Sequence, residues 1–310
     1  MEFALAIQST DQITCLDQPW NRSDHSLIEQ ETVGNVQTVL QSFYESPTFT
    51  RLYVGSEFCQ YRLPKANDLV RAYHKAVKAG FSFTFVTPYV TQAGLGQVRQ
   101  LLAVLHEEAF KNNDTIEIVV NDWGVLFEVN QKYSHSQPVV GRLLNKMIRD
   151  PRVAHLYDRE DVPQKANAVL QTPAVSVPYF KRFLQTHHVN RIEFDNLIQN
   201  MGSPLGEEEF SSSLHIGFGV IASGRSCLVG TLHKPKEEKF KGEVKCKQQC
   251  RHYQVELVST KEQLGTLPTR NIQKGNSVFY QQTEELLVKG IQWALEKNVN
   301  RIVVSPKIPV

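Results

Sequence analysis

The sequence predicts an α/β fold in which strands and intervening helices form a (β/α) barrel of the TIM type, complete or distorted. Short β-rich runs alternate with longer stretches of helical period, as expected when helices cover a largely parallel sheet. About eight such runs in 310 residues fit a barrel better than a small doubly wound sheet. The composition, 41% hydrophobic and 21% charged, is that of a globular chain, so it excludes disorder and fibrous repeats.

The elements are expected in an alternating order along a single domain that covers residues 1–310. Gly80 and Asn298 each follow a helical run, and both residue types accept the left-handed backbone that ends a helix. The expected strands are 3–7, 51–55, 81–86, 115–120, 152–157, 191–196, 214–220 and 301–305. The expected helices are 33–46, 67–80, 95–112, 178–189 and 281–298.

Several predicted strands place polar side chains on the face opposite their apolar face. Successive side chains of a strand alternate, so one set faces the helices and the other faces the barrel interior. The polar set predicted to face the interior consists of Glu117, Asn121, Glu193, Asp195 and His215. Buried ion pairs or loop caps would explain any one of these residues. Together they favour a polar ligand cavity, with Glu193, Asp195 and His215 as acid–base candidates and Asn121 as a substrate ligand.

The segment from about 222 to 277 interrupts the alternation of strands and helices. It contains several turn residues, many lysines and little helical period, which predicts an irregular insertion in the barrel. Three of the five cysteines lie in it: Cys227, Cys246 and Cys250. Cys59 follows the predicted strand 51–55, at the end of a barrel strand where loops face the active side. Cys15 lies in an early loop and has no evident partner.

Four of these cysteines suit either of two sulfur-bound metal groups. Tetrahedral zinc and an iron-sulfur cluster both select thiolate ligands, and spacing alone does not separate them. A structural zinc site usually has two local cysteine pairs, whereas CKQQC is the only pair here. The scattered set is therefore more typical of a cluster within an enzyme fold, although isolated cysteines such as Cys59 are often simply buried.

The segments RLYVGSEFCQYR, FSFTFVTPYVT, IEIVVNDWGVL, VNRIEFDN, SGRSCLVG and CKQQCR occur in this order. In these segments the chain resembles the collagenase-like peptidase family of unknown catalytic type. The similarity is greatest to its short UbiU- and UbiV-type iron-sulfur proteins of oxygen-independent ubiquinone biosynthesis, and it covers most of residues 3–260. The resemblance implies that Cys59, Cys227, Cys246 and Cys250 hold a four-iron four-sulfur (4Fe-4S) cluster.

The resemblance further implies hydroxylation of an aromatic or quinone-precursor substrate without dioxygen, with prephenate as the oxygen donor. Arg62 and Arg225 flank two of the cysteines, and arginines pair with carboxylates in bidentate fashion, so both are predicted substrate ligands. The resemblance also implies a partner of the same family, as a heterodimer or a homo-oligomer. The alternatives are a non-catalytic, metal-stabilised partner subunit and an RNA-base hydroxylation factor.

Charge, hydropathy and motifs limit the partners, the cellular setting and the activities that can be expected. The net charge is only +2 and no aromatic stacking pattern accompanies the lysines of the insertion, which argues against nucleic acid as a partner. No run approaches the roughly 18 apolar residues of a membrane-spanning helix, and the amino terminus lacks the features of a secretory signal. A cytoplasmic setting is therefore expected. Proteolysis ranks last because neither HExxH nor GxSxG occurs.

Overall fold

Eight parallel strands close into a barrel in the computed structural model, which confirms the predicted fold class. The structure describes residues 1–8, 24–152, 154, 159, 161–199, 201–202, 210–240, 246–258 and 268–310. Around the barrel the strands follow the order β1-β12-β7-β6-β5-β4-β3-β2. They are β1 (Glu2–Ile7), β2 (Phe49–Gly55), β3 (Ser82–Val86), β4 (Ile116–Val120), β5 (Ser136–Val140), β6 (Arg191–Asp195), β7 (Ser211–Ile216) and β12 (Arg301–Val304).

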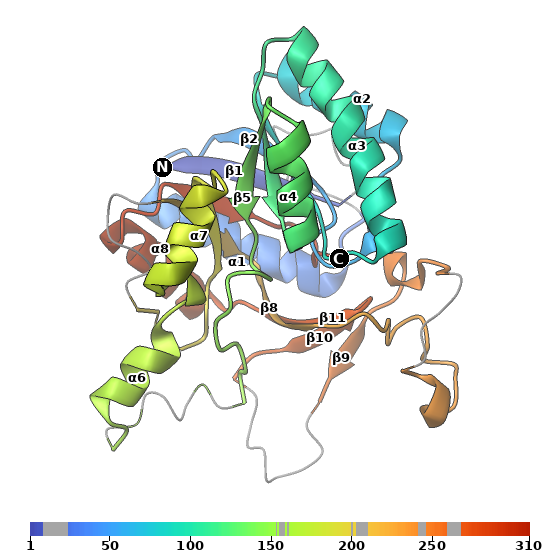
Figure 1. The fold of residues 1–310 in the computed structure, drawn as a ribbon. Helices are drawn as coiled ribbons and strands as arrows, with labels where there is room; N and C mark the ends of the chain where they lie inside the picture. The colour runs from blue at the N-terminus through green and yellow to red at the C-terminus, as the bar shows by residue number, and fades with distance from the viewer. Residues whose placement is uncertain are drawn as a thin grey trace.

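Helices surround the barrel (Figure 1), and two of them, α2 and α8, end at the stops that the sequence predicted. Gly80 has φ of 78° and Asn298 has φ of 53°, so each takes the left-handed conformation that stops its helix. After α2 the backbone N–H of Phe81 donates to the carbonyl of Ala76 at 2.9 Å, which completes the C-terminal cap. The longer helices are α1 (Leu27–Phe43), α2 (Ala66–Lys78), α3 (Gln92–Lys111), α4 (Trp123–Lys132), α6 (Gln164–Gln171), α7 (Pro178–Thr186) and α8 (Glu284–Glu296).

The fifth barrel strand is β5, and the prediction of a strand at 152–157 was wrong where it can be checked. Of that range the structure describes only Arg152 and Ala154, and neither lies in a strand. The other residues of the range lie outside the described residues. β5 was missed because it is short, begins with two polar residues and contains Pro138, which is uncommon inside a strand.

A second sheet lies outside the barrel and contains part of the predicted insertion. The run 214–220, predicted as one strand, is divided at Gly217 (φ of 104°) between β7 of the barrel and β8 of this sheet. The strands of this second sheet are antiparallel and follow the order β8-β11-β10-β9. They are β8 (Phe218–Ser223), β9 (Val255–Leu257), β10 (Asn271–Lys274) and β11 (Ser277–Gln281). Because β8 starts directly after β7 ends, the sheet lies at the carboxyl end of the barrel strands (Figure 1).

The barrel strands have one apolar face and one mixed face, as their period-two pattern indicates. Ile116, Ile118 and Val120 belong to the large hydrophobic cluster between strands and helices. Val119 joins a small apolar cluster inside the barrel, and Glu117 lies in the same strand on that inner face. The interior is therefore layered, with apolar side chains between polar groups at the two ends of the barrel.

Ion pairs fill the amino-terminal end of the barrel. Arg301 is only 1% exposed and donates to both carboxylate oxygens of Glu117, at 2.6 and 3.0 Å. It also donates to Glu2 at 2.6 Å, and Arg51 bridges Glu2 and Glu117 at 2.7 and 3.4 Å. Glu117 thus pairs with arginines at the end opposite the loops in which a TIM barrel places its sites.

Candidate functional site

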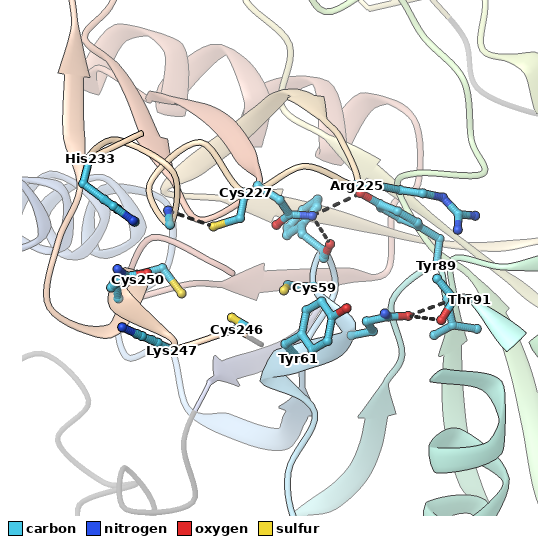
Figure 2. Close-up of a pocket in the computed structure, with 16 residues that line it drawn as sticks. Cys59, Tyr61, Tyr89, Thr91, Arg225, Cys227, His233, Cys246, Lys247 and Cys250 are labelled. Carbon is cyan, nitrogen blue, oxygen red and sulfur yellow. Dashed lines mark hydrogen bonds between the residues drawn. The ribbon is translucent and has the colours of Figure 1, made fainter. Parts of the chain in front are cut away.

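A cavity of about 290 Å³ lies where the loops after β2 and β3 meet the inserted segment (Figure 2). These loops follow the carboxyl ends of their strands, which is the usual position of a site in a (β/α) barrel. The barrel loops contribute Phe58, Cys59, Gln60, Tyr61, Tyr89, Val90 and Thr91 to the lining. The insertion and its sheet contribute Arg225, Cys227, Gly230, His233, Cys246, Lys247, Gln249, Cys250 and Asn276.

Four free thiols share this cavity. Cys59 and Cys250 are buried, at 9% and 4% exposure, while Cys227 and Cys246 are partly exposed. Figure 2 shows their four sulfur atoms turned toward a common space. Among the residues that the structure describes, no three His, Cys, Asp or Glu side chains form a group able to hold a single metal ion. Cys15 lies outside the described residues.

The loop after β2 is shaped by backbone contacts around Cys59. Ser56 closes it, because its Oγ donates to the Cys59 carbonyl at 2.8 Å and accepts from the Cys59 N–H at 3.2 Å. The short 3-10 turn Gln60–Arg62 follows, with the Arg62 N–H donating to the Cys59 carbonyl at 3.0 Å. These bonds fix the direction in which the chain leaves Cys59 and enters α2.

Backbone N–H groups approach two of the inserted cysteines. Gly230 donates to Cys227 Sγ at 3.3 Å, and Gln248 donates to Cys246 Sγ at 3.4 Å. Gln248 has a left-handed backbone with φ of 52°, in the turn between Cys246 and Cys250. Such N–H groups favour a sulfur with negative charge, as in a thiolate ligand.

Hydrogen bonds join the barrel loop that carries Cys59 to the insertion and its sheet. Gln248 Nε2 donates to the carbonyl of Tyr61 at 2.5 Å. Asn276, in the turn between β10 and β11, donates through Nδ2 to the carbonyls of Phe58 and Gly224, both at 2.7 Å. The loop of Cys59 is therefore held beside the insertion that carries Cys246 and Cys250, about 190 residues further along the chain.

The cavity favours protonated thiols when it holds no cation. Burial raises the pKa of the Cys59 thiol to about 12, with the neighbouring thiols adding to the rise. Burial likewise raises the pKa of Cys227 and of Cys250. Metal binding must therefore displace protons from these thiols, which couples occupancy of the site to pH.

The cavity lining includes the exposed positive residues Arg225 and Lys247, and none of its lining residues is Asp or Glu. The Arg225 guanidinium lies 5.8 Å from the centre of the Tyr89 ring, in a cation–π arrangement. Lys247 lies between the two cysteines of CKQQC and is exposed. Arg62 is half-buried beside the site, where burial lowers its pKa, and its Nη1 donates to Gln248 at 3.5 Å.

The other predicted site residues lie away from the cysteine cavity. Asn121 is 2% exposed and joins two loops, donating to the Thr87 carbonyl at 3.0 Å and accepting from the Leu143 N–H at 3.0 Å. The carboxylate of Asp195, fully buried, contacts Arg142 at 2.6 Å and Arg149 at 2.8 Å. Both are engaged in bonds that hold the barrel loops.

Glu193 and His215 form a separate pair inside the barrel. His215 Nε2 contacts Glu193, and Tyr53 donates its hydroxyl to the same carboxylate at 2.8 Å. A small cavity of about 30 Å³ borders the pair, with room for about one water molecule. Burial acts to raise the pKa of Glu193, but His215 and the hydroxyl of Tyr53 outweigh it, so the pKa is lowered.

Sequence reasoning overlooked several residues that line the cavity. Tyr89 follows the carboxyl end of β3, so the position rule that found Cys59 also applies to it. Tyr61 and Lys247 are each within two residues of a cysteine. No sequence pattern pointed to Asn276, because its contact with Phe58 depends on how the second sheet packs.

The fold and the site define a class of protein: a TIM-type barrel with a four-thiol cavity at the carboxyl ends of its strands. Comparisons with protein-family models, with curated proteins and with solved structures found no match. Among the described residues, no helix is long and apolar enough to cross a membrane.

Proposed function

We propose that the chain is an iron-sulfur protein that holds a 4Fe-4S cluster on Cys59, Cys227, Cys246 and Cys250. The observation that carries the proposal is the meeting of these four free thiols in one cavity at the carboxyl ends of the barrel strands. Backbone N–H groups directed at two of the sulfurs support it further. When bound, such a cluster supplies one-electron transfer.

The donor set fits a cluster better than zinc. A zinc ion needs all four sulfurs about 2.3 Å from one centre. The described side chains form no group of that kind. In a four-iron cluster each thiolate binds a different iron, so the four sulfurs need not surround a single ion. No Asp or Glu lines the cavity, which also suits a soft, sulfur-selecting group.

For the substrate we propose an anionic aromatic or quinone-precursor molecule, in oxygen-independent hydroxylation. Among the lining residues, the exposed Arg225 and Lys247 supply positive charge, and Tyr89 and Tyr61 supply aromatic surface. An arginine at this position pairs with a carboxylate in bidentate fashion. Prephenate, the oxygen donor that the family resemblance implies, has that chemistry.

A second candidate is a partner subunit that carries a metal group but performs no chemistry of its own. It is favoured by one observation: the acid–base candidates Glu193, Asp195 and His215 do not line the cysteine cavity. Electron transfer to, or support of, a second chain of the same fold requires no such groups. A catalytic partner of the same family would then supply them.

The test is anaerobic purification followed by an absorption spectrum and analysis of iron, sulfide and zinc. We expect a brown protein with about four irons per chain, as a 4Fe-4S cluster requires. The Cys227→Ser and Cys250→Ser variants should lose iron and visible absorbance together, whereas Cys15→Ser, outside the four, should keep both. A colourless protein with one zinc per chain would contradict the cluster proposal and indicate a zinc site instead.

A further inference from the structure

A buried arginine lies directly beneath the loop that carries Cys59. Arg142, which follows β5, is 1% exposed. Its Nε and Nη2 donate to the two carboxylate oxygens of Glu57 at 2.9 and 2.5 Å, in bidentate geometry. Its Nη1 donates to Asp195 at 2.6 Å, at the end of β6. One side chain thus connects the loop after β2 with β6 across the mouth of the barrel.

The same arginine reaches the next residue of the loop. Its guanidinium carbon lies 5.4 Å from the centre of the Phe58 ring, which also packs edge-on against Phe279 at 5.1 Å. Its Nη1 donates weakly to the carbonyl of Phe218, at 3.4 Å, where β8 begins. Arg142 therefore contacts the two residues that precede Cys59 and one end of the second sheet.

Stability alone does not account for four buried charges at this place. Arg149 completes the group by contacting Asp195 at 2.8 Å, so two arginines balance two carboxylates. Desolvation makes such a group no more stabilising than a well-packed apolar cluster of the same volume. The directional bonds of a guanidinium do, however, fix geometry in a way that apolar packing does not.

We infer that Arg142 is a positioning residue for Cys59: through Glu57 and Phe58 it holds the thiol at the distance from Cys227, Cys246 and Cys250 that the metal group requires. This inference rests on the proposed function for the nature of that group. Among the four cysteines, Cys59 alone comes from the barrel, so its place relative to the others depends on such contacts.

The opposite end of the barrel supplies matched controls. Arg301 is also 1% exposed and contacts both oxygens of Glu117, but it lies at the amino-terminal end. Arg142→Lys and Arg301→Lys therefore remove the same chemistry from equally buried positions. Glu57→Gln and Glu117→Gln form a second, milder pair that keeps side-chain size and is suited to the case in which a lysine variant fails to fold.

The first measurement is iron per chain and the rate at which a chelator bleaches the visible absorbance, with the melting temperature recorded for each variant. We expect Arg142→Lys and Glu57→Gln to bleach about 5- to 30-fold faster than the unchanged protein, the effect of one or two kcal/mol. Arg301→Lys and Glu117→Gln should bleach at the unchanged rate even with an equal fall in melting temperature. Equal bleaching in all four variants would overturn the inference.

The second measurement uses the metal-free protein and so separates this inference from the proposed function. Iodoacetamide labelling, located by mass spectrometry, should modify Cys59 about fivefold faster or more in Arg142→Lys and Glu57→Gln, because the loop opens more often. Cys59 should stay at the unchanged rate in the Arg301 and Glu117 variants. Iron absent from the unchanged protein would end the cluster proposal, whereas unaltered Cys59 labelling in Arg142→Lys would end the positioning role.

Discussion

Gly55 is the residue that sets the start of the cysteine loop. Its φ of 141° lies in a region that side chains rarely adopt, and an added Cβ would stand 2.1 Å from the carbonyl oxygen of Val86. The absence of a side chain therefore lets the end of β2 approach β3 closely. Ser56 and Cys59 are one and four residues after Gly55, so the close approach of β2 to β3 helps to determine where the cavity begins.

Replacing Gly55 by Ala should lower the free energy of unfolding by about 2 kcal/mol or more, since the new Cβ must displace the β3 backbone. Gly34 provides the control. It is exposed within α1 and an added Cβ meets nothing within 4 Å, so Gly34→Ala should raise the free energy of unfolding by up to about 1 kcal/mol. Urea denaturation measures both, and an unchanged Gly55→Ala midpoint would contradict the steric argument.

Residue patterns located the cysteines and two arginines better than they located the acid–base groups. Arg225 lines the cavity and Arg62 lies beside it, because each is within three residues of a cysteine in the chain. Asp195 shows the opposite case. The alternation of side chains along its strand correctly placed Asp195 on the inward face. Its partners Arg142 and Arg149 are distant in sequence, so only the fold shows that Asp195 is held in ion pairs.

At the scale of elements, the run LHIGFGV shows how one apolar stretch serves two sheets. Its period is continuous through Gly217, which is why it predicts a single strand. At Gly217 a φ of 104° turns the chain out of the barrel, and the next residues pair with β11. Alternating apolar residues indicate that one face of a strand is buried, whereas tertiary packing determines which strand it pairs with.

Helix α8 offers a local prediction. Thr283 precedes it, and its hydroxyl accepts a hydrogen bond from the Leu286 N–H at 3.3 Å. Thr283→Ala should cost about 1 kcal/mol of unfolding free energy, because one N–H at the helix start loses its acceptor. Thr283→Ser keeps the hydroxyl and should stay close to the unchanged protein. Thermal melts monitored by circular dichroism compare the two, and equal melting temperatures would rule out the cap.

At the scale of the whole molecule, the two ends of the barrel have different roles. The amino-terminal end is closed by arginine–carboxylate pairs around Glu117 and Arg301. The carboxyl end carries the thiols, with Arg142 beneath the loop. The described residues therefore hold structural charge pairs at both ends of the barrel and the cysteine cavity at its carboxyl end.

Acid should destabilise the molecule through these buried carboxylates. Burial acts to raise the pKa of Glu117, but the hydrogen-bonded charge of Arg301, with Arg51 and Arg191 nearby, outweighs it and the pKa is lowered. A lowered folded-state pKa stabilises the fold above the unfolded value of about 4.3. That contribution is lost as the pH falls further through the folded-state pKa.

We therefore expect the free energy of unfolding to fall below about pH 4.3, and to fall less steeply in Glu117→Gln, which has no proton to take up there. Urea denaturation at pH values from about 3 to about 7, a range that includes the ordinary pKa of a glutamate, measures the dependence of unfolding free energy on pH for both proteins. Leu257→Ala, at an exposed position without charge, serves as a control that should keep the unchanged slope. Equal slopes for Glu117→Gln and the unchanged protein would exclude Glu117 as a source of acid sensitivity.

The sequence by itself determined the barrel, most of its strands, the ends of α2 and α8, and the four cysteines, because these depend on local period, turn chemistry and residue type. Only the tertiary structure decided that β5 completes the barrel, that the insertion forms a second sheet, and that the thiols face one cavity. It also decided that Asp195 pairs with Arg142. Each of these depends on contacts between residues far apart in the chain, which local patterns do not encode.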